Sequence, residues 1–203
     1  MLRKAAIVGV AALSLSALPL ESGATVSASV SRSLQGLLLT THDLPPGWTQ
    51  EHFPSLYGQH CTTPKSVTEL VGPKGVGSIF ARRGGEPLLV EYLAQSSNRF
   101  APLESAISKL GTFASCSLSS NGRVLYSSTN DGVFQVPFYG DWSLGTRVHN
   151  VVRGRRSELG YLLIRKYPYL LIVAYENTGS LNVPEINSFA SKALAKLLDQ
   201  RAR

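Results

Sequence analysis

The sequence predicts an α+β domain: a twisted antiparallel sheet flanked by amphipathic helices. Three observations lead to this class. β-rich segments come in pairs separated by glycine-containing turns, which is typical of antiparallel hairpins. Between and after these pairs, apolar residues recur at helical spacing, which indicates helices that pack on the sheet. The chain has 203 residues, of which 43% are hydrophobic and 16% charged, enough for one domain with a buried core.

The first 28 residues have the layout of a secretory signal peptide. Two basic residues, Arg3 and Lys4, precede an apolar stretch that ends at Leu20. This stretch falls short of the roughly 20 apolar residues that a spanning helix needs. Small residues follow it, so we expect cleavage after Ala28, with Ala24 as second choice. An uncleaved signal that anchors the chain is the alternative. No arginine pair precedes the stretch, which favours the general secretory pathway, and no cysteine near its end could carry a lipid.

Residues 29–203 would form the mature extracytoplasmic domain. The whole chain carries a formal charge of +7, and loss of Arg3, Lys4 and Glu21 would leave about +6. Such a charge favours anionic partners, although dispersed solubilising charge is the simpler interpretation. No lysine-rich run or aromatic-basic RNA-binding signature appears, so nucleic-acid binding is not expected. No segment after Ala28 is long and apolar enough to span a membrane, and we expect a soluble product.

The first part of the domain is predicted to be a short helix and a strand. Four leucines in residues 33–40 give this segment one apolar side. The prolines of residues 43–47 then stop the helix, because proline cannot continue it. Residues 48–53 are predicted to be the first strand. Residues 54–73 are loop-like, with at most one helical turn at 66–71.

A hairpin and an amphipathic helix come next. Residues 78–82 and 88–95 are extended segments, and the glycines between them supply the turn. Residues 99–115 are predicted to form the helix, since apolar side chains recur there at helical spacing. These side chains are Leu103, Ile107, Leu110 and Phe113.

The next segments are predicted to be strands again. Residues 123–129 and 133–138 are separated by Asn130-Asp131-Gly132, which is typical of a turn. Residues 144–152 and 157–166 flank an arginine-rich hairpin loop.

The last two predicted elements are a strand and a helix. Residues 169–175 are almost wholly apolar and β-rich, which predicts a central strand covered on both faces. A terminal helix follows, with Asn182 and Glu185 at capping-box spacing. Its predicted buried face consists of Ile186, Phe189, Ala190, Ala193, Leu194 and Leu197.

Cys61 and Cys116 are the only cysteines, and export would take them to an oxidising compartment. We therefore predict a structural disulfide between them, which would close a loop of roughly 55 residues. The alternative is a catalytic thiol, which needs a nearby base and a lowered pKa. Neither cysteine belongs to a CxxC pair or a recognisable nucleophile motif.

The sequence shows no catalytic or metal-binding pattern, so we expect no enzyme activity, no metal and no cofactor. The four histidines, His42, His52, His60 and His149, form no closely spaced ligand pair. A Ser-His-Asp triad would need His149 and Asp141, but there is no GxSxG elbow, and Asp141 is better explained by a turn into the following strand. Nothing in their spacing selects Glu86, Glu91 and Glu104 as catalytic carboxylates. Phosphate-cradling and dinucleotide fingerprints are absent.

Two segments are weak candidates for a ligand site. Arg153, Arg155 and Arg156 form the densest positive patch, which is either a solvated hairpin tip or a contact for an anionic envelope component. Aromatic residues also crowd one segment, where they either line a cleft or, as we favour, fill the core. The candidates among them are Phe138, Tyr139 and Trp142.

The mature domain opens with Leu37-Leu38-Leu39 and then Asp43-Leu44-Pro45-Pro46-Gly47-Trp48. This opening resembles the "leucines, then D-L-P-x-G-W/F" of an actinobacterial extracellular sensor-domain family, which includes the extracellular domain of the mycobacterial serine/threonine kinase H. Cys116 after the middle helix, the Gly140-Asp141 step and the closing Leu162-Leu163-Ile164-Arg165-Lys166 also fit. The resemblance spans roughly residues 33–200.

This resemblance implies a twisted antiparallel sheet flanked by helices, disulfide bonding and a cleft for an unidentified ligand. The chain departs from the family in three ways. It has one candidate disulfide where the kinase domain has two. Tyr167-Pro168 replaces the usual glycine turn before the last strand, and no kinase domain precedes the segment.

Two functional hypotheses follow, with an enzymatic one as a minor third. The first is a secreted, non-enzymatic domain of the bacterial envelope that binds a small molecule or envelope component in a cleft. The alternative is an envelope-associated protein that binds anionic wall polymer or lipid through its basic surface.

Overall fold

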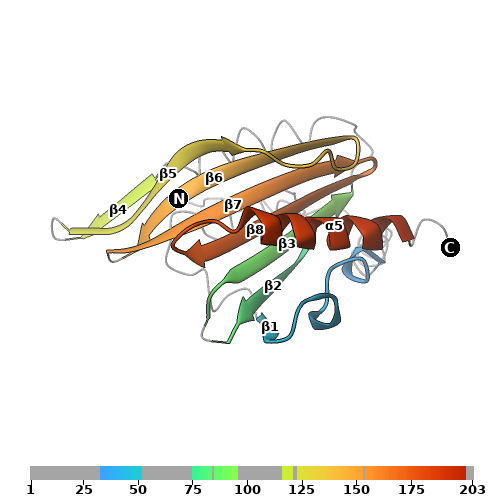
Figure 1. Cartoon of the computed structure of the whole chain (residues 1–203), viewed down its shortest axis with the longest axis horizontal. Helices are drawn as coiled ribbons and strands as arrows, with labels where there is room; N and C mark the ends of the chain where they lie inside the picture. The colour runs from blue at the N-terminus through green and yellow to red at the C-terminus, as the bar shows by residue number, and fades with distance from the viewer. Residues whose placement is uncertain are drawn as a thin grey trace, which may run out of the picture.

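The computed structural model describes residues 33–51, 75–83, 85–95, 116–120, 123–152 and 154–199 (Figure 1). Of residues 116–120, 123–126 and 152, only the backbone is described. Eight strands lie in these ranges: β1 Trp48–Glu51, β2 Val76–Arg82, β3 Leu88–Gln95, β4 Cys116–Ser120, β5 Arg123–Phe134, β6 Trp142–Val152, β7 Arg155–Lys166 and β8 Tyr169–Thr178. The 3-10 helix η1 spans Thr41–Asp43, and helix α5 spans Val183–Asp199.

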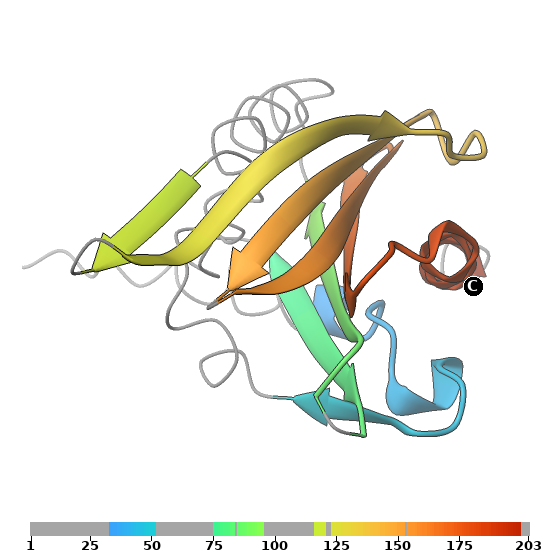
Figure 2. The same ribbon diagram turned by 60° about the vertical axis from the view of Figure 1, so that its left-hand side comes forward.

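All eight strands belong to one antiparallel sheet in the order β1-β2-β3-β8-β7-β6-β5-β4. The last strand of the chain, β8, therefore lies between β3 and β7. The predicted central position of residues 169–175 is confirmed. The sheet is strongly curved, and α5 lies on its concave side (Figure 2). The predicted α+β class with an antiparallel sheet and a C-terminal helix is confirmed.

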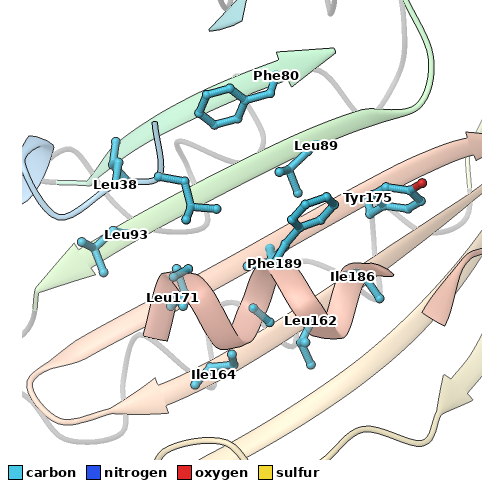
Figure 3. Close-up of a cluster of buried hydrophobic side chains, with 14 of the residues drawn as sticks. Leu38, Phe80, Leu89, Leu93, Leu162, Ile164, Leu171, Tyr175, Ile186 and Phe189 are labelled. Carbon is cyan, nitrogen blue, oxygen red and sulfur yellow. The ribbon is translucent and has the colours of Figure 1, made fainter. Parts of the chain in front are cut away.

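Helix α5 packs on the sheet through the face that its periodicity predicts. Of the six predicted residues, five are buried, and Leu194 is partly buried at the edge of the contact. Phe189 and Ile186 lie over Leu162, Leu171 and Tyr175 of β7 and β8 (Figure 3). Gly160 of β7 makes room for the chain entering the helix, because a Cβ there would lie 2.8 Å from Leu181 Cδ1.

The start of α5 is capped as its sequence predicts. Asn182 Oδ1 accepts a hydrogen bond from the Glu185 backbone N–H at 3.2 Å. The Glu185 carboxylate in turn accepts from the Tyr175 hydroxyl at 2.6 Å and from the Arg82 guanidinium at 2.5 Å. These contacts tie the first turn of the helix to β8 and β2.

Residues 33–44 are called the N-terminal cover below. They pack on the concave face of the sheet beside α5. The predicted helix over residues 33–40 is wrong in extent, because helical backbone is described only at residues 33–35 and turns follow. Leu34, Leu37, Leu38 and Leu39 are all buried against the sheet and α5. Three consecutive leucines cannot share one helix face, so the backbone leaves the helix to bury all of them.

The central strands are buried on both faces. A second cluster of buried side chains covers the convex side, with Val90 on β3, Leu163 on β7 and Ile172 on β8 among its members. Two-sided burial explains why these strands have nearly continuous apolar sequences. Both predicted hairpins are confirmed, β2 with β3 and β6 with β7.

The prediction of two short strands separated by a turn at residues 130–132 is wrong. One strand, β5, runs through this segment and pairs with β6 on both sides of it. Its register shifts between Asn130 and Val133, and Asn130 Oδ1 accepts a hydrogen bond from Gly132 N at 2.8 Å. The Asn-Asp-Gly sequence therefore forms a bulge that bends the strand. Residues 135–138 lie outside the sheet, and the edge strand β4 was not predicted.

Several predictions concern residues outside the described ranges and stay predictions. They include the signal peptide at residues 1–28, the loop at 54–73, the helix at 99–115 and the side chains of Cys61 and Arg153. Within the described part of the chain, no helix is long and apolar enough to cross a membrane.

Candidate functional site

The three aromatic candidates lie in three different environments. Phe138 is 81% exposed in the loop between β5 and β6. Tyr139 is buried on the concave side, against α5. Trp142 packs partly buried against the cluster on the convex side. The structure therefore does not bring these rings together around one cleft.

Tyr139 fastens the β5–β6 loop to helix α5. Its hydroxyl donates to the Asn187 carbonyl oxygen at 3.1 Å and accepts from Ser191 Oγ at 3.2 Å. Its backbone N–H donates to Ser143 Oγ, which in turn donates to the Pro137 carbonyl oxygen. The loop is thus held at both ends while Phe138 points away.

Replacing Tyr139 by phenylalanine is expected to lower the free energy of unfolding by about 1 kcal/mol, because the hydrogen bonds that join its hydroxyl to the Asn187 carbonyl oxygen and to Ser191 Oγ are lost. Denaturant unfolding of the purified protein would measure the change. Ser188→Ala, at an exposed position of the same helix, is the matched control and should change stability by less than about 0.5 kcal/mol. An equal effect of both substitutions would contradict the anchoring role.

Asp141 joins the same loop to the β7–β8 turn. Its carboxylate accepts from the Tyr167 backbone N–H at 2.8 Å and from Lys166 Nζ at 3.1 Å. The hydrogen bond from Tyr167 is the main reason that the pKa of Asp141 is lowered. The prediction that Asp141 belongs to a turn entering β6 is confirmed.

Arg155 and Arg156 are exposed at the free end of the β6–β7 hairpin. They pair with Val152 and Val151 of β6 and are adjacent in strand β7. Adjacent side chains of a strand point to opposite faces of the sheet. The structure therefore does not bring these two arginines together on one face.

An open hollow of about 410 Å³ lies between η1 and the second half of α5. It is lined by His42, Asp43, Lys192, Ala195, Lys196 and Asp199. Lys192 Nζ donates to the Asp43 carbonyl oxygen at 2.7 Å. Lys196 Nζ donates to the Leu38 carbonyl oxygen at 2.6 Å and to Asp43 Oδ2 at 2.8 Å. The two lysines thus fasten the N-terminal cover to α5.

Asp43 is held in its charged form at the centre of this hollow. Partial burial opposes its ionisation, but hydrogen bonds from Lys196 and Thr40 outweigh that effect and lower the pKa of Asp43. Thr40 contributes its backbone N–H at 2.7 Å and its hydroxyl at 2.9 Å.

Glu91 lies beneath the N-terminal cover on the concave face of β3 and is 0% exposed. Its Oε2 accepts from the Leu39 backbone N–H at 2.6 Å and from Ser78 Oγ at 3.3 Å. Its Oε1 accepts no hydrogen bond from any residue that the structure describes. Burial raises the pKa of Glu91 to about 7, although the hydrogen bonds from Leu39 and Ser78 oppose this.

Sequence reasoning named Glu91 only as one of three unselected carboxylates and did not name Asp43, Lys192 or Lys196 as site residues. The signal for Glu91 was its place as the one acidic residue in the apolar run of β3. Glu86, by contrast, lies exposed at the β2–β3 turn, and Glu104 is outside the described residues. The structure does not bring Glu86 and Glu91 together as a catalytic pair.

The hollow offers cationic donors to a small ligand. A lysine ammonium has three donor hydrogens, and Lys192 uses one of them and Lys196 two in the hydrogen bonds above. Counted over the described residues, each lysine therefore keeps at least one donor hydrogen for a ligand. No group of side chains that could hold a metal ion occurs in the described part of the chain.

The protein is an α+β domain whose eight-stranded antiparallel sheet curves around the C-terminal helix. The same fold occurs in the extracellular domain of PknH from Mycobacterium tuberculosis. That structure matches with a TM-score of 0.51 over 84% of this chain and 95% of the other, at 12% sequence identity. The fold that the short sequence motifs implied is thereby confirmed.

A second solved structure is an uncharacterized protein of Mycobacterium smegmatis, the Rv0999 ortholog. It matches with a TM-score of 0.42 at 15% identity, over 83% of this chain and 95% of the other. No family model matches the chain. A search of curated proteins finds no match either.

Proposed function

We propose that this chain is an extracytoplasmic, non-enzymatic binding domain that takes a small molecule with an acidic group in the hollow between η1 and α5. Two features support the extracytoplasmic part. The sequence begins with the layout of a signal peptide. The fold is that of a domain described as extracellular in another protein.

The pair of lysines at the wall of the hollow is the observation that favours a ligand with an acidic group. Its volume of about 410 Å³ is within the usual range for small-molecule sites. Asp43 Oδ2 accepts from Thr40 and Lys196, and the Lys196 ammonium balances the charge of this carboxylate. Among the described residues, Lys192 hydrogen-bonds to a neutral carbonyl oxygen, so its positive charge stays available to a ligand.

The test is binding of small carboxylates and phosphate esters to the secreted protein, followed by calorimetry and by NMR shifts of backbone amides. We expect shifts to concentrate at residues 42–43 and 192–199. Lys192→Gln should weaken binding by roughly 10- to 100-fold, which corresponds to loss of one charge-assisted hydrogen bond. Lys196 is a poorer choice for substitution, because it also holds the N-terminal cover.

The matched control is Arg155→Gln, which removes the same charge at the other end of the sheet. It should leave binding unchanged. Equal binding by Lys192→Gln and the unmodified protein, or shifts that map to the β6–β7 hairpin, would overturn the proposal. The second outcome would support the alternative of a basic surface that binds anionic envelope polymer.

A further inference from the structure

We propose that Glu91 is a pH-sensitive latch for the N-terminal cover, residues 33–44. While its carboxyl is protonated, the cover stays on the sheet; when the carboxyl ionises, the cover loosens. This inference goes beyond ligand binding and does not depend on it.

The carboxyl group of Glu91 lies where the sheet meets the cover. Glu91 is in the middle of β3, and its side chain lies on the concave face between Leu89 and Leu93, which are both buried. Its Oε2 accepts the backbone N–H of Leu39, 52 residues earlier in the chain. The hydrogen bond therefore joins the sheet directly to the cover.

A charge at this position would be costly. Within the described part of the chain, Oε1 has no hydrogen-bond partner, and no part of the residue is exposed to water. A buried carboxylate with an unpaired oxygen is strongly disfavoured. Water can reach it if the cover moves, since the cover is the surface element bonded to it. Ionisation and opening of the cover are therefore coupled.

The groups that face Glu91 do not neutralise a charge on it. From β2 its neighbour is Ser78, and from β8 it is Val173, neither of which is charged. Lys196 of α5 attracts a charged Glu91, and Asp43 of η1 repels it. Lys196 is hydrogen-bonded to the Leu38 carbonyl oxygen and to Asp43, so it compensates another carboxylate first.

The direction of the pH effect follows from the two states of the cover. Burial raises the pKa of Glu91 to about 7 in the closed form, from its ordinary 4.5. Between these values the open form has lost its proton while the closed form keeps it. The closed form is thus favoured at acidic pH, and this advantage is lost as pH rises from about 4.5 to 7 and then levels off.

The test is hydrogen exchange of the Leu39 backbone amide, corrected for the intrinsic exchange rate. Its protection factor should fall by roughly 50-fold between pH 5 and pH 8. The amide of Leu163, in the centre of β7, should keep its protection, because only the cover opens. A parallel fall at Leu39 and Leu163 would mean global unfolding and would overturn the latch.

Glu91→Gln keeps the size of the side chain and an acceptor for the Leu39 N–H but cannot ionise. Leu39 protection in this variant should not depend on pH. Glu86→Gln, at an exposed position of the same hairpin, is the control and should behave as the unmodified protein does. A pH-dependent fall that persists in Glu91→Gln would contradict the proposal.

A measurement on the unmodified protein keeps the proposal testable should Glu91→Gln not fold. The Glu91 side-chain carboxyl carbon can be titrated by NMR while Leu39 protection is followed on the same samples. We expect the carboxyl to titrate near pH 7, at the upper end of the fall in protection. Titration near the ordinary value, or protection independent of pH, would overturn the proposal.

Discussion

Replacing Phe189 by alanine is expected to lower the free energy of unfolding by about 4 kcal/mol. The ring is 1% exposed at the centre of the concave cluster. It meets Trp48 edge to face, with ring centroids 5.4 Å apart, and Tyr175 at 6.1 Å. Its removal would leave a cavity between α5, β1 and β8, which the paired strands of the sheet cannot close by collapsing.

Denaturant unfolding, followed by far-UV circular dichroism, would measure this loss. Leu198→Ala is the matched control, because Leu198 lies on the same helix but is 41% exposed. It should change stability by less than about 0.5 kcal/mol. A loss below about 1.5 kcal/mol for Phe189→Ala would contradict the central position of this ring in the core.

The elements that sequence reasoning identified correctly are those whose pattern is local. The predicted helix has an apolar residue at each turn and a cap at Asn182, and helix α5 shows both features. Strand β8 is a continuous apolar run because it is buried on both faces between β3 and β7. In each case the packing environment is the same along the whole element, so the local sequence pattern is enough to predict the element.

Prediction failed where tertiary pairing overrides a local signal. Asn130-Asp131-Gly132 is typical of a turn, but β6 pairs with β5 on both sides of it, so the chain bulges and continues. In the N-terminal cover, the predicted helix ends early. Leu37, Leu38 and Leu39 are all buried, and three consecutive side chains cannot share one helix face. The edge strand β4 is rich in serine and has little β propensity of its own.

The hollow and the buried carboxyl of Glu91 were harder to predict because three distant segments build them. Lys196 and its partner Asp43 are separated by 153 positions, and Glu91 comes from a third element between them. No local spacing records such contacts. Conversely, Phe138, Tyr139 and Trp142 are close in sequence but point to solvent, to α5 and to the convex face. Proximity along the chain did not indicate a shared cleft.

Reduction of the predicted Cys61–Cys116 disulfide is expected to lower the free energy of unfolding by about 4 kcal/mol. A cross-link around a loop of roughly 55 residues restricts the unfolded chain by about that amount in the chain-entropy model. Cys116 begins β4, where it pairs with Ser128 of β5. The edge strand β4 has only β5 as a neighbour in the sheet, so a covalent link at its first residue would be a second constraint on it.

Mass spectrometry of the secreted protein after digestion without reductant should give one linked peptide pair and no free thiol. Unfolding of Cys61→Ser and of the unmodified protein with reductant should then show the same loss, because each removes the same constraint. The unmodified protein in reductant is the necessary control, since it separates loss of the bond from replacement of the side chain. Two titratable thiols in the native secreted protein would refute the disulfide, and a loss confined to Cys61→Ser would assign the effect to packing of that side chain. Reduction alone should therefore reproduce the loss if the bond exists.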